Sequence, residues 1–260
     1  MPPRRRQPSL TEVSGTWPDH VALYRFASID STNAEAARRA KTAPGPFWCI
    51  AEHQTAGRGR RGRAWRQGGQ NFTASFCTCP DLSAAQLAQY SFVAALALFE
   101  TLAQIGVPSD TLALKWPNDV LADGKKISGI LLETVPTDRG LGIIVGIGVN
   151  IAAPPPQPDL EAGAMPAAAI ADFGVEITAD GVLSALAPIF SQWEAQFLRT
   201  GFAPIRAAWI ARAMGIGSRI TARLPNAEHV GVFEDVDENG ALILGAAKGR
   251  LVLSAADVYF

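Results

Sequence analysis

The sequence predicts an α/β fold of the α+β kind, with a mainly antiparallel mixed sheet flanked by helices and a small β-barrel after it. Two observations carry this prediction. Apolar segments of strand length alternate with longer segments of helical periodicity as far as residue 214. Beyond that point, short strands follow one another closely and are separated by turn signals, which is typical of a small barrel. We therefore expect a flexible tail over 1–20, a main domain over 21–214 and a barrel over 215–260.

The main domain is expected to contain six strands and four helices. Helices are indicated where apolar residues recur every three or four positions, as at Leu87, Tyr90, Ala94 and Leu98. They are expected over 31–42, 83–105, 180–199 and 204–214. Strands are expected over 21–27, 47–52, 71–77, 112–122, 126–135 and 141–151. A glycine- and arginine-rich loop should cover 55–70, and a proline-rich loop 152–158.

Local signals fix some of the element ends. Thr32 and Glu35 have the spacing of a helix capping box. Asp123-Gly124 is a dipeptide preferred in tight hairpins, so it should join the fourth and fifth strands. In the barrel, strands are expected over 220–224, 229–236, 241–244 and 250–253, with turns at 225–226, 239–240 and 248–249.

Composition narrows the class of protein. The 260 residues are 48% hydrophobic and 18% charged, which is enough to bury at least one sizeable core. The formal net charge of −1 argues against a generally basic nucleic-acid binder. Three cysteines do not suggest a disulfide framework. Neither a signal peptide nor an apolar segment of membrane-spanning length is visible. These features favour a cytoplasmic protein that does not bind a membrane.

An arginine-rich segment is the most unusual part of the sequence. Five arginines lie within nine residues, at 58, 60, 61, 63 and 66, with no acidic residue between His53 and Gln70. Such a cluster is costly unless an anion neutralises it, and the guanidinium fork matches phosphate and carboxylate oxygens. Glycines 57, 59 and 62 let the backbone approach a ligand closely. Trp65 could offer a flat surface to a purine, and Gln54 a neutral hydrogen-bonding group.

Three interpretations of this segment compete. Gly57, Gly59 and Gly62 match the G-x-G-x-x-G dinucleotide fingerprint, but that motif requires a helix to begin at the loop. Here the loop continues into another strand, which disfavours a dehydrogenase. An arm that binds single-stranded nucleic acid and a solvated basic loop remain open from this segment alone.

A second cluster of polar residues lies over 115–129. The sequence Lys115-Trp116-Pro117-Asn118-Asp119 leads through a hairpin to Lys126 and Gly129. Asp119 and Lys126 are separated by one turn between two strands, so both can face one pocket. They could form an ordinary ion pair, or serve a site for a nucleotide and an anionic substrate. The run over 146–150, Gly-Ile-Gly-Val-Asn, brings small residues and an amide to a strand end, where a base or ribose could approach.

Together these segments resemble the biotin protein ligase family. The resemblance rests on Ser31-Thr32-Asn33, Gln54 with residues 57–63, residues 115–119, residues 126–130 and Gly148-Val149-Asn150. It is strong over 21–150 and weak beyond. It implies a catalytic domain over 21–214, related to class II aminoacyl-tRNA synthetases, and an SH3-like barrel over 215–260. Larger members carry an N-terminal DNA-binding domain, whereas about twenty residues precede the first strand here. The resemblance therefore implies a monofunctional ligase that does not bind DNA.

The family activity implied is a two-step reaction. Biotin and ATP form biotinyl-5′-adenylate, and biotin is then transferred to a lysine of a biotin carboxyl carrier domain. The alternative is a lipoate or octanoyl ligase of the same superfamily. Those acyl chains need little hydrogen bonding, so the polar residues 31–33 and Gln54 favour biotin, whose ureido group donates and accepts. The protein could also pair with a second copy or with the carrier through an exposed sheet edge.

The resemblance also implies roles for individual residues. The catalytic residues are Lys126, Arg58 and Asp119, with Asp119 accepting a proton or orienting the incoming amine. The biotin-binding residues are Ser31, Thr32, Asn33, Gln54, Gly57, Arg58, Gly59, Arg60, Lys126 and Gly129. The nucleotide-binding residues are Arg60, Arg61, Arg63, Trp65, Lys115, Asn118 and Asn150. Magnesium is expected to be carried by the phosphates of ATP rather than by a site on the protein.

Overall fold

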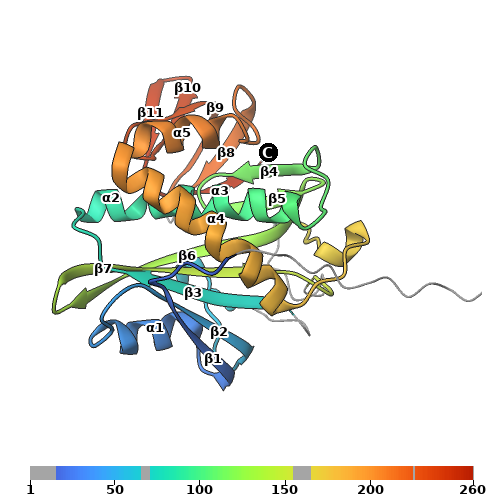
Figure 1. Ribbon diagram of the computed structural model, residues 1–260. Coiled ribbons are helices and arrows are strands. Elements are labelled where there is room, and N and C mark those ends of the chain that lie inside the picture. Colours follow the sequence, from blue (N-terminus) through green and yellow to red (C-terminus); the bar gives the residue numbers. More distant parts are fainter. Residues whose placement is uncertain (1–15, 66–70, 155–164, 225, 260) are drawn as a thin grey trace, which may run out of the picture.

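A computed structural model describes residues 16–65, 71–154, 165–224 and 226–259. Its centre is a seven-stranded sheet in the order β1-β2-β3-β7-β6-β5-β4 (Figure 1). Only the β1–β2 pair is parallel in this sheet, which confirms the expected mainly antiparallel, mixed arrangement. Outside the described residues lie 1–15 of the expected tail, 66–70 of the arginine-rich loop and 155–158 of the proline-rich loop.

The strands of the main sheet largely match the segments expected from their apolar patterns. They are β1 (Ala22–Ile29), β2 (Phe47–Gln54), β3 (Phe72–Thr78), β4 (Leu112–Lys115), β5 (Asp119–Ala122), β6 (Lys125–Thr137) and β7 (Gly140–Val149). The β5–β6 connection is the expected hairpin: Asp123 and Gly124 have φ values of 51° and 68°, which suit the Asp-Gly dipeptide.

Helices cover both faces of the main sheet. Helix α1 (Thr32–Ala40) packs on one face, and α3 (Tyr90–Gln104) with α4 (Ala179–Thr200) lies on the other (Figure 1). Helices α2 (Ala84–Ala88) and α5 (Phe202–Ile210) and the 3-10 turns η1 (Arg60–Gly62) and η3 (Ile170–Phe173) complete this part. Among the described residues, no helix is long and apolar enough to cross a membrane.

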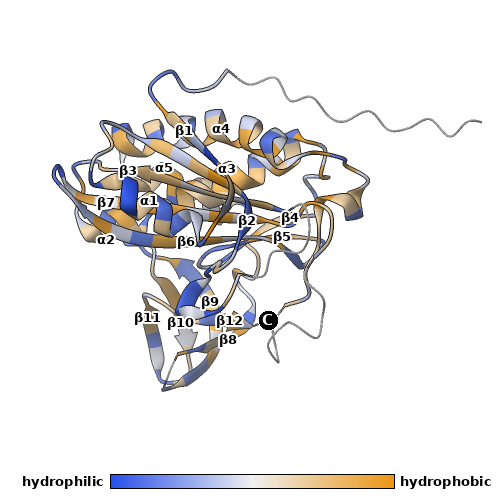
Figure 2. Ribbon diagram, turned by 90° about the horizontal axis from the view of Figure 1, so that it is seen from below, coloured by the Kyte–Doolittle hydropathy of each residue, from blue (hydrophilic) through white to orange (hydrophobic). Residues whose placement is uncertain are grey.

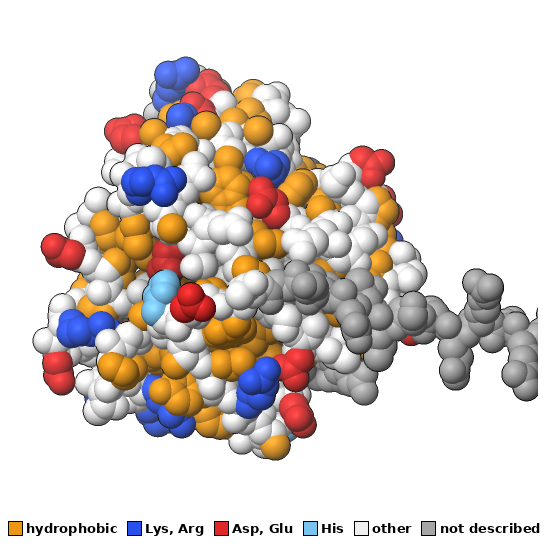
Figure 3. Space-filling model, viewed as in Figure 1, with side chains coloured by type: hydrophobic (Ala, Val, Ile, Leu, Met, Phe, Trp, Pro, Cys, Tyr) orange, Lys and Arg blue, Asp and Glu red, His pale blue; other side chains and the backbone are white. Residues whose placement is uncertain are grey.

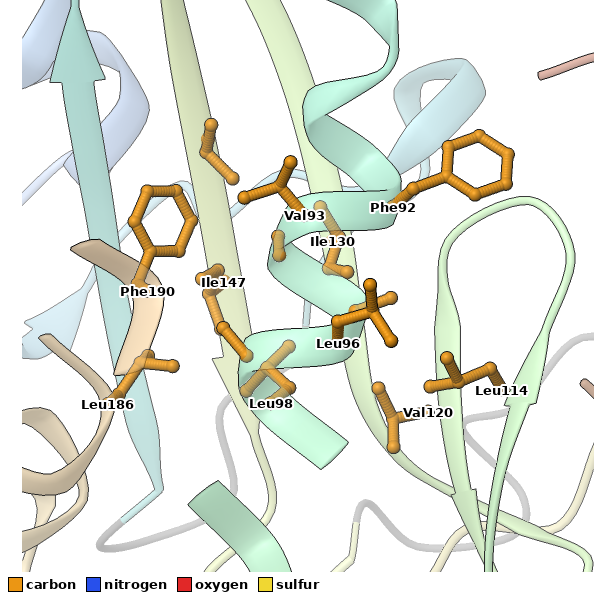
Figure 4. Packing of buried hydrophobic residues seen from close by; sticks show 14 of the residues in the cluster. Phe92, Val93, Leu96, Leu98, Leu114, Val120, Ile130, Ile147, Leu186 and Phe190 are labelled. Atoms are coloured by element: carbon orange, nitrogen blue, oxygen red, sulfur yellow. The ribbon is translucent and has the colours of Figure 1, made fainter. Parts of the chain in front are cut away.

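Alternation along the strands divides the buried residues between the two faces. On β3, Phe72, Ala74 and Phe76 belong to the large core under α3 and α4, whereas Cys77 belongs to the smaller core under α1. Figure 4 shows the large core, in which Leu96 of α3 and Phe190 of α4 point toward the sheet. Full burial of each such side chain contributes about 1.5–3 kcal/mol. Two polar residues of β3, Thr73 and Ser75, are also buried and alternate with the apolar residues of the large core.

The C-terminal sheet has five antiparallel strands in the order β11-β10-β9-β8-β12. They are β8 (Arg219–Arg223), β9 (Glu228–Val236), β10 (Leu242–Ala246), β11 (Gly249–Leu253) and β12 (Asp257–Tyr259). The sheet projects from the layered body (Figure 2) and is consistent with an SH3-like domain. The four strands expected from the sequence are present, and β12 was not anticipated. Arg206 of α5 ties the two parts together through Asp235, at 2.6 Å.

Three expectations for the helices were wrong. Ser31, not Thr32, is the N-cap of α1, and Glu35 pairs with Arg38 and Arg39 instead of closing a capping box. The helix expected over 83–105 is divided at Gln89 into α2 and α3. Helix α5 begins at Phe202, two residues before the expected start, because Gly201, with a φ of 72°, ends α4 there, and it ends at Ile210 instead of 214.

The strand expected over 112–122 is a hairpin of two strands. Lys115 of β4 pairs with Asp119 of β5, and Trp116, Pro117 and Asn118 form the turn, with a cis bond before Pro117. Proline lacks the backbone N–H that a strand interior needs, so it interrupts the ladder at this point. The turn places Lys115 and Asp119 side by side, and the next strand brings Lys126 close to both.

Candidate active site

One cavity of about 390 Å³ lies where the N-terminus of α1, the ends of β2 and β7, the β4–β5 turn and β12 meet. The segment between β2 and β3, residues 57–65, borders it; we call this the arginine segment. Residues far apart in sequence therefore converge on one space, as expected for a ligand site. Its walls differ in chemistry from one side to the other.

A network of hydrogen bonds between mostly neutral groups forms the wall nearest α1. Gln54 Oε1 accepts from the backbone N–H of Thr32 at 2.7 Å, and Ser75 Oγ lies 2.7 Å from Thr32 Oγ1 and 2.6 Å from Asn33 Oδ1. Asn33 Nδ2 donates to Glu133 at 2.7 Å. We call these five residues the polar network. Because Thr32, Asn33 and Ser75 are buried, their side chains are held in fixed orientations by one another.

The rest of the lining carries most of the charge, and Arg58 Nη2 lies 3.3 Å from Glu133 Oε2 of the polar network. The cavity lining contains five cationic side chains, which we call the cationic set: Arg58, Arg60, Arg63, Lys115 and Lys126. The described lining residues include two carboxylates against them, Asp119 and Asp257. The excess of three positive charges suits a polyanion such as a nucleotide. By contrast, cationic and acidic side chains are interspersed on the outer face seen in Figure 3.

Lys126 lies at the centre of the cationic set. Its Nζ is 2.6 Å from Asp119 Oδ1, and Lys115 is close by, with only 9% of its surface exposed. Burial lowers the pKa of Lys115, and the charge of Asp119 partly offsets this effect. Burial also lowers the pKa of Arg60, whose Nη1 donates to Asn118 Oδ1 at 3.0 Å. These desolvated cations would be stabilised by an anion in the cavity.

The arginine segment folds back on itself beside the cavity. The backbone N–H of Gly59 donates to the carbonyl of Arg63 at 2.7 Å, and the backbone N–H of Trp65 donates to the carbonyl of Gly57 at 3.0 Å. Between them, Arg61 has a φ of 55°, a left-handed conformation that is uncommon for a side chain other than glycine. None of the three residues of η1 is buried. The segment is thus a small hairpin held chiefly by polar contacts.

Two glycines of the sheet make room for the indole of Trp65. A methyl group at Gly148 would overlap the indole, and one at Gly129 would lie 3.2 Å from it and 3.1 Å from the Lys126 side chain. The indole Nε1 is buried, as is Asn150 Oδ1, and neither atom has a hydrogen-bond partner among the described residues. Buried polar atoms without partners mark places where a ligand can supply the missing bond.

This arrangement can hold an anion between Lys126 and the arginines while a neutral, hydrogen-bonding group lies on the polar network. A planar ring could contact the indole. The geometry therefore suits a reaction in which a small polar acid meets a nucleotide.

Comparison with known proteins agrees with this geometry. The model of the biotin/lipoate A/B protein ligase family matches residues 24–150, and that of the biotin protein ligase C-terminal domain matches residues 215–260. The chain is 46% identical to a biotin–[acetyl-CoA-carboxylase] ligase of Paracoccus denitrificans over 90% of its own length and 99% of the relative's. It belongs to the biotin protein ligase family.

Other relatives of this ligase differ in length. It is 34% identical to a biotin–[acetyl-CoA-carboxylase] ligase of Mycobacterium tuberculosis, covering 89% of the chain and 86% of the relative. It is 32% identical to a bifunctional ligase/repressor of Bacillus subtilis, covering 95% of the chain but 75% of the relative.

Solved structures share the fold. A biotin protein ligase from Aquifex aeolicus in complex with biotin and ATP superposes with a TM-score of 0.75 at 24% identity, covering 92% of this chain and 97% of that one. A biotin protein ligase from Leishmania major in complex with biotinyl-5-AMP gives 0.60 at 23% identity, covering 92% and 100%.

Most of the site residues expected from the sequence converge on the cavity. Those that line it are Ser31, Thr32, Asn33, Gln54, Arg58, Gly59, Arg60, Arg63, Trp65, Lys115, Asn118, Asp119, Lys126, Gly129 and Asn150. Two expected residues do not line it. Gly57 packs against the backbone of Trp65, and Arg61 turns to Asp257. The structure thus brings the residues together, while their individual roles stay predictions.

Sequence reasoning missed residues on strands that had no motif. Ser75 and Glu133 support the polar network, and Asp257, Val258 and Tyr259 of β12 line the cavity from the C-terminal sheet. A signal for Ser75 existed: small polar residues alternate with large apolar ones along β3, which indicates a face that packs on something polar. No comparable signal marked Asp257.

Proposed function

We propose that the cavity joins biotin to ATP as biotinyl-5′-adenylate and then transfers biotin to a lysine of a biotin carboxyl carrier domain. The observation that carries this proposal is that the polar network and the cationic set border one cavity and touch where Arg58 pairs with Glu133 at 3.3 Å. The polar network suits the ureido group of biotin, since it offers amide and hydroxyl donors and acceptors together. The cationic set suits the phosphates of ATP.

In the first step, a carboxylate oxygen of biotin attacks the α-phosphorus of ATP. The new bond is an acyl phosphate, the bond between the α- and β-phosphates breaks, and pyrophosphate leaves. Both reactants are anions, so positive charge must persist into the transition state. Lys126 would bridge carboxylate and phosphate, and Arg58 and Arg60 of the same cavity lining would add positive charge. The ion pair with Asp119, at 2.6 Å, would hold the Lys126 ammonium in place until the substrates bind.

Biotin and ATP would lie on opposite sides of Lys126. The biotin ring system would contact Ser31, Thr32, Asn33, Gln54 and Gly129, and the adenine would approach Trp65 and Asn150 near Lys115 and Asn118. The unpartnered Asn150 Oδ1 is suited to accept a hydrogen bond from an exocyclic amine. Gly57 and Gly59 would allow the arginine segment to approach the adenylate.

Magnesium would enter with ATP. Among the described residues, no group of three or more His, Cys, Asp or Glu side chains is arranged to hold a metal ion. Asp119 and Asp257 of the cavity are both paired with cations, so the ATP phosphates rather than protein carboxylates would be the main ligands of the ion. When bound, it would neutralise phosphate charge.

In the second step, the carrier lysine attacks the acyl carbon of the adenylate, the bond to AMP breaks, and the amine loses a proton. The ordinary lysine pKa is about 10.4, so a proton acceptor helps. Asp119, whose carboxylate lies 2.6 Å from Lys126 in the same cavity, would accept this proton or orient the incoming amine. The arginine segment would cover the anhydride and exclude water.

The organisation proposed for the whole chain follows from this site. Residues 21–214 form the catalytic domain and 215–260 a C-terminal domain that contributes β12 to the cavity. The partners are the carrier domain, biotin and ATP, in the cytoplasm. Strand β1 is an edge of the main sheet and could pair with a second copy of the chain or with the carrier.

A transfer assay tests the proposal. The protein is incubated with ATP, magnesium, a purified carrier domain and either biotin or lipoate. We expect a streptavidin-detectable label on the carrier with biotin and no acylation with lipoate. Efficient lipoylation would favour the lipoate or octanoyl ligase alternative, and transfer of neither acid would overturn both.

A further inference from the structure

Asp257 of β12 contacts two arginines of the arginine segment at once. Its Oδ2 is 2.8 Å from Arg61 Nη1 and 2.5 Å from Arg63 Nη2. The carboxylate is largely shielded, with 16% of its surface exposed. The two arginines therefore bind one oxygen of a side chain that lies on the other domain, almost 200 residues along the chain.

The position of Asp257 is fixed by the C-terminal sheet. Asp257 pairs with Arg223 of β8 in the antiparallel ladder, and the next pair is Val258 with Ala222. Val258 and Ala222 are both buried. The carboxylate is thus attached to a rigid element, whereas the arginine segment it holds has no buried residue in η1.

The charge of Asp257 extends beyond these two contacts. It raises the pKa of both Arg60 and Lys115, against the lowering effect of burial. It thus faces four cations, at 60, 61, 63 and 115, on one side of the cavity. A negative charge among these cations opposes the binding of an anion. Its contact with the arginine segment offers a role that would offset this cost.

We propose that Asp257 is a positioning residue that fastens the arginine segment over the cavity and thereby retains the adenylate. This rests on the proposed function. Arg61 and Arg63 fasten the segment to β12, and Arg58 also pairs with Glu133 of β6. Arg58, Arg60 and Arg63 line the cavity. The left-handed conformation of Arg61 is consistent with this, because it turns the side chain away from the cavity lining and toward β12.

The first test measures the fastening without any ligand. Trypsin cleaves after arginine, so the rate of cleavage at 58–63, mapped by mass spectrometry, reports how often the segment opens. In Asp257→Asn we expect cleavage there to be about three- to tenfold faster than in the wild type, as fits the loss of two partly exposed ion pairs. Asp257→Glu should restore most of the protection. The matched control is Glu234→Gln, which removes another carboxylate–arginine pair of the C-terminal sheet, with Arg250.

The second test measures retention. Asp257→Asn should release adenylate to solution several-fold faster, measured by biotin labelling of free amines. Release is expressed relative to the adenylate formed, so a general loss of structure, which lowers formation, does not imitate the effect. Arg61→Gln should also increase release, and the double variant should exceed Asp257→Asn little, because Asp257→Asn already removes the contact that Arg61→Gln removes.

The outcomes separate this proposal from the function on which it rests. Equal cleavage of wild type and Asp257→Asn, together with equal release of adenylate, would overturn the positioning role. Absence of biotin transfer by the wild type would overturn the proposed function, and the ligand-free cleavage measurement would still decide whether Asp257 fastens the segment.

Discussion

Thr32, Asn33 and Gln54 of the polar network line the same cavity as the cationic set, but the polar atoms of the two groups differ in the partners that they have. In the polar network, Thr32, Asn33 and Gln54 are bonded to one another or to Ser75 and Glu133 before any ligand binds. In the cationic set, positive charge exceeds negative charge. Beside that set, Trp65 Nε1 and Asn150 Oδ1 are buried without partners among the described residues.

This difference suggests two ways of recognising a ligand. The polar network is already rigid, so a neutral ligand can bind to it with little reordering. The cationic set is partly paired, through Lys126 with Asp119, Arg63 with Asp257 and Arg58 with Glu133. An anion in the cavity would compensate the positive charge that remains. Variants of the polar network should therefore mainly weaken biotin binding, whereas variants of the cationic set should mainly affect ATP binding and the adenylate.

The largest effect is expected at the junction of the two regions. Lys126→Ala should slow adenylate formation by about a thousandfold, because it removes the cation placed between carboxylate and phosphate. Biotin affinity should change much less. Pyrophosphate release in single turnover measures the first quantity, and isothermal titration the second. Lys125→Ala is the control, since Lys125 is the exposed neighbour on β6; an equal loss in both variants would contradict the assignment.

The next effect is expected in the arginine segment. Arg60→Gly should release the adenylate about ten- to hundredfold faster, because it removes a charged group whose hydrogen bonds to a phosphate are among the strong ones. Release is measured by filtration of the protein after adenylate formation. Arg139→Gly, which removes an exposed arginine bonded to Pro44, is the control. Retention as tight as in the wild type would mean that the segment does not close the site.

A smaller effect is expected in the polar network. Ser75→Ala should weaken biotin binding about tenfold, since it leaves the buried oxygens of Thr32 and Asn33 with fewer partners. ATP affinity, measured on the same preparation, serves as the internal control and should hardly change. An equal loss of both affinities would show that Ser75 acts on the fold rather than on the polar network.

The smallest effect is expected from salt. Raising the ionic strength from about 0.05 M to about 0.5 M should weaken ATP binding several-fold and biotin binding less, because ions screen the cationic set but not neutral hydrogen bonds. Titration of each ligand at both salt concentrations measures this. If salt weakened biotin binding as much as ATP binding, the distinction between the two regions would be wrong.

The sequence predicted the site better than it predicted the local geometry. The arginine segment and residues 115–119 stand out because glycine, arginine and lysine are unusual at such density, and they do meet at one cavity. The hairpin of β4 and β5 was expected as one strand because apolar residues continue on both sides of Pro117. The proline marked the turn, but the apolar pattern outweighed it.

Other residues could not be found from local patterns. Glu133 lies in an apolar strand, and it reaches Asn33 only because α1 packs against β6 in the folded protein. Asp257 follows no motif, and its contact with Arg61 depends on how the C-terminal sheet sits against the main domain. Tertiary contacts of this range have no periodic signature in the sequence.

The most direct test of the central claim is ATP–pyrophosphate exchange without a carrier. If the polar network holds biotin beside the cationic set, the wild type should exchange labelled pyrophosphate into ATP when biotin and magnesium are present. Exchange should be absent without an acid and negligible with lipoate. Exchange independent of biotin, or equally fast with lipoate, would contradict the account.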